Sequence, residues 1–239
     1  MPRRDKKRLE YFFKHAILHN DYGYTLLGDK PVSLCAYRKI SFSSDVMNNY
    51  SVLLPHNIRM GLGWKTWKKH AHHFNLKHFA LWEEESPWIH NGVVIVLANQ
   101  EKVNQTYEMF KEDFQRFGKG IDLKRVTIEP LLKEQLRSHE GLIGTILGYG
   151  RDNAWLYASR KGYSMSEALW EDEIEKQLLK QFQGKTLAEK LGYPQFIADV
   201  DSMETRRLKE KYKKARKVIL QTYEGKDFLE TTLNLLTVF

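Results

Sequence analysis

Hydrophobic residues recur every three to four positions along much of the chain, which is the spacing of one face of an α-helix. The pattern predicts helices at residues 9–19, at about 58–73 and at about 201–223. Asn99 is a favourable N-cap, and the apolar positions after it predict a helix to about residue 117. Shorter helices are expected around residues 132–146, at 153–160, at about 166–181 and after Asp227.

Other stretches have the composition of β-strands. Residues 92–98 form the longest uninterrupted apolar run, as expected for a strand that is buried on both faces. Residues 32–37 alternate between apolar and small polar side chains and predict a second strand. Residues 22–27 look extended and are expected to pair with it in a hairpin. A further strand is predicted at 76–82, where the acidic residues and the proline at 83–87 should end it.

These elements predict an α+β fold, formed by a single domain over residues 1–239. We expect a small β-sheet with helices in an N-terminal part at about 9–125. A mainly helical C-terminal part, at about 126–239, would pack against it.

Composition places the chain among soluble globular proteins. Its 239 residues are 42% hydrophobic and 28% charged. The longest apolar run is far shorter than the roughly 20 residues of a membrane-spanning helix, and we recognise no secretory signal. Cys35 is the single cysteine, which excludes an intramolecular disulfide and favours a reducing compartment. The sequence therefore predicts a cytoplasmic protein without a membrane span.

The charge is strongly positive, with a formal net charge of +8 and a pI of about 9.3. Such a chain can contact nucleic acid, anionic lipid or an acidic protein. Eight basic residues lie between positions 206 and 217. A helix that contacts RNA or DNA has this composition, and so does a solvated helix whose apolar stripe packs on the core.

The densest unusual chemistry lies around residues 148–155. Gly141, Gly144 and Gly148 occupy a predicted apolar helix, where an exposed glycine costs roughly 1 kcal/mol relative to alanine. Close backbone packing against a neighbouring element would offset this cost. A ligand lying on the bare backbone would do the same.

Arg151, Asp152 and Asn153 follow at the start of the next predicted helix, where free N–H groups attract anions. Arg151 could hold a carboxylate or phosphate in a bidentate contact. Alternatively, Asp152 caps its own helix and Arg151 pairs with a nearby acid. The spacing is not that of a P-loop, and no predicted strand precedes it, which argues against a nucleotide-binding motif.

The histidines and the cysteine do not form a recognised catalytic or metal motif. His70 and His73 are spaced to share a metal ion, but no ligand set completes a zinc site. Trp64, Trp67 and the lysines between them indicate a basic, aromatic helix surface instead. Cys35 lacks the local signature of a nucleophile. We therefore expect no metal and no cofactor.

Two stretches resemble uncharacterised proteins of chlamydia-type intracellular bacteria. They are residues 21–31, with the sequence DYGYTLLGDKP, and residues 141–155, which end in GYGRDNAW. The strand and helix expected at 92–117 also fit, so the resemblance extends over most of the chain. No activity is assigned to that group, and the resemblance implies no catalytic residue or cofactor. It implies that the two stretches form one unit that faces one cleft.

We expect a non-enzymatic binding protein whose ligand or protein partner contacts a corner built by Tyr24, Asp29, Lys30 and residues 151–153. Polar, aromatic and glycine residues gather there without a catalytic set. An alternative is an enzyme acting on a small anionic metabolite, with Arg151 binding the anion and Asp152 or a histidine as the acid or base. A further alternative is a nucleic-acid-associated protein that uses the basic helix at 206–217.

Overall fold

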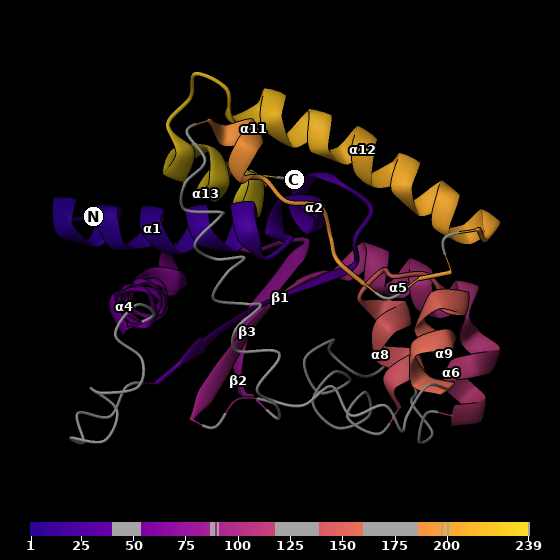
Figure 1. The fold of residues 1–239 in the computed structure, drawn as a ribbon. Helices are drawn as coiled ribbons and strands as arrows, with labels where there is room; N and C mark the ends of the chain where they lie inside the picture. Colours follow the sequence, from indigo (N-terminus) through magenta and orange to yellow (C-terminus); the bar gives the residue numbers. More distant parts are fainter. Residues whose placement is uncertain are drawn as a thin grey trace.

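A three-stranded antiparallel sheet lies at the centre of the protein, in the order β1-β3-β2 (Figure 1). Its strands are β1 (Val32–Arg38), β2 (Phe79–Glu85) and β3 (Gly92–Asn99). The structure is a computed structural model. It describes residues 1–39, 54–86, 89, 91–117, 139–159, 186–196, 198–199 and 201–238.

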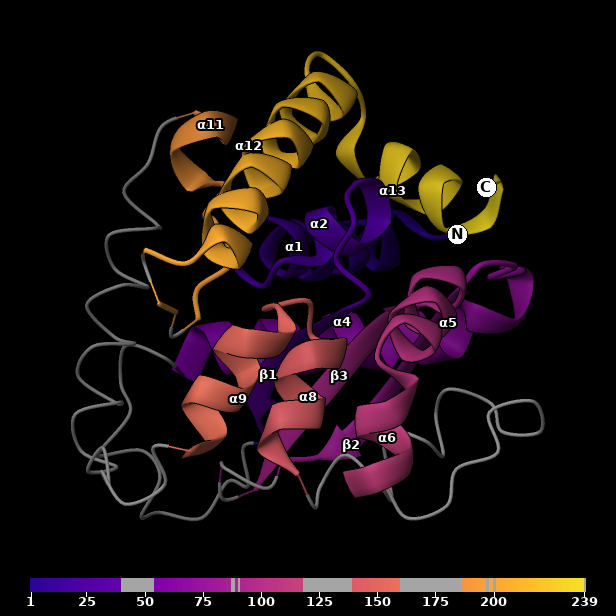
Figure 2. The ribbon, with the colours of Figure 1, turned by 90° about the vertical axis from the view of Figure 1, so that its right-hand side faces the viewer.

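The central strand β3 is buried on both faces, as its sequence predicts. Val93, Ile95 and Leu97 belong to one hydrophobic cluster, while the side chains between them belong to a second cluster on the opposite face. This alternation follows from the two-residue period of a strand. The fold therefore places one layer of helices on each face of the sheet (Figure 2).

The first face is covered by N-terminal helices and by the end of the chain. They are α1 (Arg3–His19), α2 (Tyr22–Leu27) and α4 (Leu54–His70), which continues into the short 3-10 helix η1 (Ala71–His73). The long helix α12 (Met203–Tyr223) packs on α2, and α13 (Phe228–Val238) packs on α1. The short helix α11 (Leu187–Lys190) also contacts α1.

The second face is covered by α5 (Gln100–Met109), α6 (Lys111–Phe117) and α8 (Glu140–Ile146). The helix α9 (Arg151–Ser159) packs against α8. Both clusters draw their apolar side chains from helical stripes.

The predicted α+β fold is confirmed, with its sheet formed by residues 32–99. Asn99 caps α5, because its side-chain oxygen accepts a hydrogen bond from the backbone N–H of Lys102 at 3.2 Å. The long C-terminal helix is also confirmed, since Tyr212, Ala215 and Ile219 form part of its buried stripe. The division expected near residue 125, residues 132–138 of the helix expected around 132–146 and the whole helix at 166–181 lie outside the described residues, while residues 140–146 form a helix as predicted.

The prediction of a hairpin at residues 22–37 is wrong. Residues 22–27 form the helix α2 instead of a strand, and β1 pairs with β3 rather than with its sequence neighbour. Asp21 adopts a positive φ of 65°, which separates α2 from α1. Gly23 allows α12 to lie close, since a Cβ there would be 3.1 Å from a methyl carbon of Ile219. Tertiary packing thus overrides the extended conformation that the sequence predicts for residues 22–27.

Two predicted element ends are also wrong. Strand β2 continues through the acidic residues to Glu85, because it is an edge strand on which charged side chains are tolerated. The helix expected from Asn99 to about residue 117 is divided into α5 and α6 at Phe110.

Candidate functional site

The glycines of α8 pack against α9. A Cβ at Gly144 would lie 2.7 Å from the Cβ of Ala154, and a Cβ at Gly141 would lie 3.0 Å from the indole ring of Trp155. Side chains at these positions would push the helices apart. The packing interpretation is therefore confirmed for Gly141 and Gly144, whose cost to the helix is offset by close contact between α8 and α9. Gly148 lies beyond the end of α8 with a φ of 80°, so the expectation that it belongs to the same helix is wrong.

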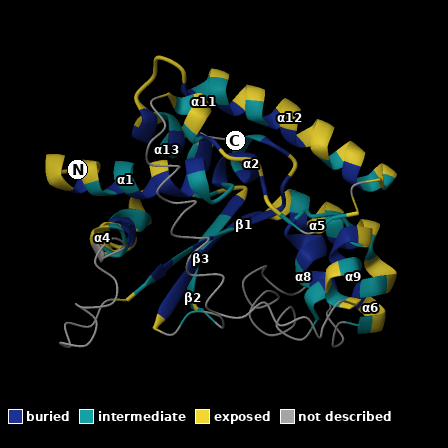
Figure 3. Ribbon diagram, viewed as in Figure 1, coloured by how far each residue is buried: buried dark blue, intermediate teal, exposed yellow. Residues whose placement is uncertain are grey.

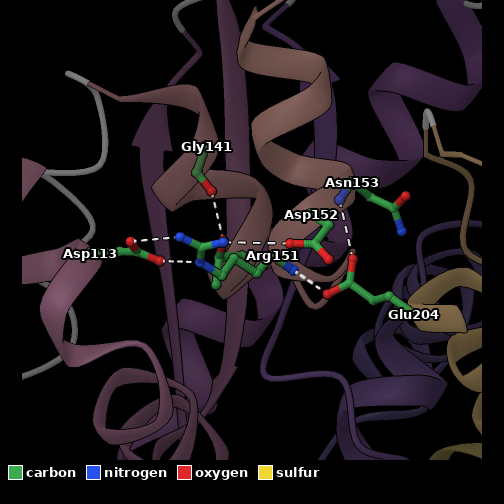
Figure 4. A network of polar contacts seen from close by, with 7 residues as sticks. Asp113, Gly141, Arg151, Asp152, Asn153 and Glu204 are labelled. Carbon is green, nitrogen blue, oxygen red and sulfur yellow. Dashed lines mark hydrogen bonds and ion pairs between the residues drawn. The ribbon is translucent and has the colours of Figure 1, made fainter. Parts of the chain in front are cut away.

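The N-terminus of α9 is already occupied by a carboxylate from within the protein. Glu204, at the start of α12, accepts hydrogen bonds from the backbone N–H groups of Arg151 at 2.8 Å and Asn153 at 3.1 Å (Figure 4). Gly150 makes room for this carboxylate, because a Cβ there would lie 2.5 Å from it. The anion expected at this helix terminus is thus the side chain of Glu204.

Arg151 forms a bidentate ion pair with Asp113 of α6. Its Nε and Nη2 atoms donate to the two carboxylate oxygens, the second at 3.0 Å. Asp152 is exposed and lies 3.4 Å from the same guanidinium. The interpretation in which Arg151 pairs with an acid is confirmed. The expectation that Asp152 caps its own helix is wrong, because Glu204 holds that position.

Asn153 is buried and links three segments of the chain. Its amide nitrogen donates to the carbonyl oxygen of Tyr149 at 3.0 Å. Its amide oxygen accepts from the backbone N–H of Asp199 and from the hydroxyl of Thr205, both at 3.1 Å. These three bonds use most of what one amide can form, so Asn153 fixes the position of α12 relative to α9.

Lys30 is 1% exposed and caps the C-terminal end of α8. Its ammonium donates to the carbonyl oxygen of Leu147 at 2.5 Å and lies 3.7 Å from a carboxylate oxygen of Asp21. It also lies 4.3 Å from the ring centroid of Tyr149. Burial lowers the pKa of Lys30 to about 8, and the Asp21 carboxylate opposes that shift. A cation at a helix C-terminus stabilises the helix dipole.

Tyr24 of α2 and Tyr212 of α12 lie beside the same region and contact each other. The hydroxyl of Tyr24 donates to the carbonyl oxygen of Gly192 at 2.8 Å, and that of Tyr212 donates to the carbonyl oxygen of Gly148 at 2.6 Å. The two rings meet edge to face, with centroids 5.5 Å apart. We call residues 147–153, together with Lys30, Glu204 and Tyr212, the α8–α9 joint.

Most residues of the predicted corner lie close together in the structure, but they bind other residues of the protein. Lys30, Arg151 and Asn153 belong to the α8–α9 joint, and Tyr24 packs on Tyr212. Asp29 is exposed at its edge, 3.2 Å from Lys102 and 3.9 Å from Lys211. Sequence inspection missed the partners Asp113 and Glu204, which lie 38 and 53 residues from Arg151. No local signal marks either residue.

The other candidate residues from the sequence, His70 and Cys35, also contact other parts of the protein. His70 binds the carboxylate of Asp5 at 2.9 Å, and the described residues hold no group of three side chains suited to a metal ion. Cys35 is buried in the first cluster, and burial raises the pKa of its thiol. Such a thiol is a poor nucleophile because the thiolate is the reactive form.

One face of α12 is exposed (Figure 3), and most of its side chains are basic. The inward-facing residues are Tyr212, Ala215, Ile219 and Tyr223. Arg216 donates to the carbonyl oxygens of Ala188 in α11 and of Leu191 just after it. We call the exposed cations of this helix the α12 basic face; they are Arg206, Arg207, Lys209, Lys211, Lys213, Lys214 and Lys217.

Only two members of the α12 basic face form ion pairs within the described part of the chain. Lys213 contacts Glu210 at 2.7 Å, and Lys211 contacts Asp29 at 3.9 Å. The other five cations face solvent and form no ion pair with a described residue, although Lys214 adds a small effect to that of Lys213 in lowering the pKa of Glu210. These five side chains can contact an external anion.

None of the protein families, curated proteins or solved structures compared with this chain is significantly similar to it. Among the described residues, no helix is both long and apolar enough to cross a membrane.

Proposed function

We propose that this chain is a non-enzymatic binding protein that holds a nucleic acid against the α12 basic face. The observation that supports this most directly is the group of five exposed cations that form no ion pair in the described structure, namely Arg206, Arg207, Lys209, Lys214 and Lys217. Neutralising phosphates with such side chains releases counterions, which supplies much of the affinity of proteins for nucleic acid.

The dimensions of the helix fit this role. Residues 206–217 extend over about 16 Å at 1.5 Å per residue. The same length of duplex axis carries about nine phosphate charges, more than the cations that face it. The buried stripe packs α12 against α2, so the backbone that carries these cations is held in place by the core.

A nucleic acid suits this face better than a membrane surface. An interfacial helix binds a membrane by inserting an apolar face among the lipids. The apolar stripe of α12 is already packed against the core, with Ile219 fully buried. The outer side of α12 carries mainly charged side chains, with Met203 and Val218 as its exposed large apolar residues, and this matches a phosphate backbone better than a lipid layer.

The α8–α9 joint is a weaker candidate for the binding surface, because internal partners hold Lys30, Arg151 and Asn153. The same contacts disfavour an enzyme that would use Arg151 to hold a small anionic metabolite. A cytoplasmic location remains part of the proposal, supported by the free thiol of Cys35. Relationship to proteins of chlamydia-type bacteria also remains a proposal, based on residues 21–31 and 141–155.

Binding to a fluorescent 20-base-pair duplex, measured by anisotropy at low salt, tests the proposed function. The triple variant Arg207→Ala/Lys214→Ala/Lys217→Ala should bind on the order of 100-fold more weakly than the wild type. A matched control, Arg3→Ala/Lys6→Ala/Lys7→Ala, removes three exposed charges from α1 and should bind nearly as well as the wild type.

Equal losses in the two triple variants would mean that net charge, rather than the α12 basic face, governs binding. No detectable binding by the wild type at low salt would also overturn the proposal. A single-stranded oligonucleotide of the same length shows which form of nucleic acid is preferred.

A further inference from the structure

A second basic site lies on another part of the surface. A groove of about 730 Å³ is formed where α1, α4 and the ends of β1 and β2 meet. We call it the α1–α4 groove. It shares no residue with the α8–α9 joint or with the α12 basic face. Its volume lies within the range of sites that bind small molecules.

Two glycines of α4 bring the walls of this groove together. A Cβ at Gly63 would lie 2.8 Å from the carbonyl oxygen of Arg8, and a Cβ at Gly61 would lie 3.1 Å from the ring of Tyr37. Glycine within a helix is unfavourable, so close packing must offset its cost here. The result is that Arg8 of α1 and Tyr37 of β1 are held beside the cations of α4.

Positive charge dominates the lining of the groove. Five cations face two carboxylates, which leaves a surplus of three positive charges; the cations are Arg8, Lys39, Lys65, Lys68 and Lys69, and the carboxylates are Asp5 and Glu83. A phosphate monoester carries a charge of about −1.5 to −2 at pH 7 and would balance most of that surplus.

Both carboxylates are already engaged. Asp5 contacts His70 at 2.9 Å and Lys69 at 3.2 Å, and hydrogen bonding to His70 is the main reason that its pKa is lowered. Glu83 accepts from Lys68 at 2.6 Å and from the indole N–H of Trp64. The acids are therefore held by neighbours on α4, and Asp5 also lies 3.9 Å from the guanidinium of Arg8 on α1.

Two lysines remain for an external anion. Lys39 and Lys65 are exposed, and neither forms an ion pair with another residue of the described ranges. Burial raises the pKa of Glu83, but its contacts with Lys68 and Trp64 lower it overall, and the charge of Lys39 adds only a smaller lowering effect. Tyr37 adds a phenol between the walls. Burial, with a smaller contribution from Glu83, raises its pKa to about 12, so at neutral pH it carries its proton and can donate it in a hydrogen bond.

We propose that the α1–α4 groove binds a small phosphate-bearing anion, with Lys39 and Lys65 as its principal contacts and Arg8 at the wall. Arginine and lysine are the side chains best suited to phosphate oxygens. This site is independent of the nucleic-acid surface proposed for α12, because the two share no residue.

Calorimetric titration of the full chain tests this site with three probes, namely orthophosphate, pyrophosphate and glucose 6-phosphate. We expect saturable one-to-one binding of at least one probe. The variant Lys39→Ala/Lys65→Ala should weaken it at least about tenfold, since each charged hydrogen bond contributes roughly that factor. The control Lys209→Ala/Lys217→Ala removes the same charge from α12 and should leave the affinity nearly unchanged.

The probes also separate two sources of the phosphate group. Tighter binding of glucose 6-phosphate than of the inorganic ions would support an organic phosphate, and the reverse order would support free phosphate. Absence of saturable binding by all three probes would overturn the proposal. Equal losses in the two double variants would do so as well, because binding would then depend on overall charge.

Discussion

The carboxylate of Glu204 is expected to contribute measurably to stability, because it caps α9 from another helix. Its two oxygens accept the backbone N–H groups of Arg151 and Asn153. Losing an N-cap costs about 1 kcal/mol, and removing a negative charge from a helix N-terminus costs up to about 1 kcal/mol more. Because two N–H groups lose their acceptor, Glu204→Ala should lower the free energy of unfolding by about 2–3 kcal/mol.

Urea unfolding followed by circular dichroism measures this loss, and thermal unfolding should show a fall in Tm of about 5–10 °C. Glu204→Gln keeps one acceptor oxygen and should lose about half as much. Glu210→Ala removes an exposed acid from the same helix and should leave the unfolding free energy close to that of the wild type. A loss below about 0.5 kcal/mol in Glu204→Ala would refute the capping role.

Further predictions concern the packing of α8 and the buried histidines. Gly144→Ala should lower the free energy of unfolding, measured with urea, by about 1–3 kcal/mol, since its Cβ would lie 2.7 Å from that of Ala154. The control Gly192→Ala should have little effect, because a Cβ there would have no atom within 4 Å. Equal effects of the two substitutions would contradict the packing argument. Burial lowers the pKa of His19 and His56 to about 4, so stability should be complete above about pH 6.5 and fall as the pH drops towards 4. Allowing for their partial exposure, the two should together cost about 2–3 kcal/mol at pH 5 relative to pH 7. Replacing both histidines by glutamine should reduce the loss of stability between pH 7 and pH 5 by that amount, while His15, whose pKa burial also lowers, continues to contribute. A profile that is unchanged in the double variant would count against the prediction.

Elements whose packing is encoded locally were predictable from the sequence. The apolar run of β3 predicts a strand that is buried on both faces, and the apolar stripe that contains Tyr212 and Ile219 predicts the helix α12. The side chain of Asn99 marks the start of α5 because the cap and its target N–H lie three residues apart. In each case the decisive interaction, or the pattern that implies it, lies within one element.

Interactions between distant segments were not predictable in the same way. Residues 22–27 look extended in the sequence, yet they form a helix because Gly23 and Gly28 pack closely against side chains of α12 nearly 200 residues later. The partners of Arg151 come from two other helices. Such contacts leave no pattern in the neighbouring sequence, because they join residues that come together only when the helices pack on the sheet.

The α8–α9 joint shows why unusual residue types are an ambiguous sign of function. A cation, a carboxylate and an amide at a helix start can bind a ligand, but the same groups can satisfy one another and the ends of neighbouring helices. Here Glu204 binds the N-terminus of α9, where an external anion would otherwise bind. Lys30 binds a carbonyl oxygen at the C-terminal end of α8. Charges without internal partners, such as those of α12, are therefore the more informative guide to a binding surface.

The salt dependence of duplex binding tests the central claim most directly. If the five unpaired cations of the α12 basic face contact phosphates, log K should fall with log salt with a slope of about −4 to −5. The variant Arg207→Ala/Lys214→Ala/Lys217→Ala should reduce the magnitude of that slope by about 2.7. A slope that is near zero, or one that the three substitutions leave unchanged, would contradict the account.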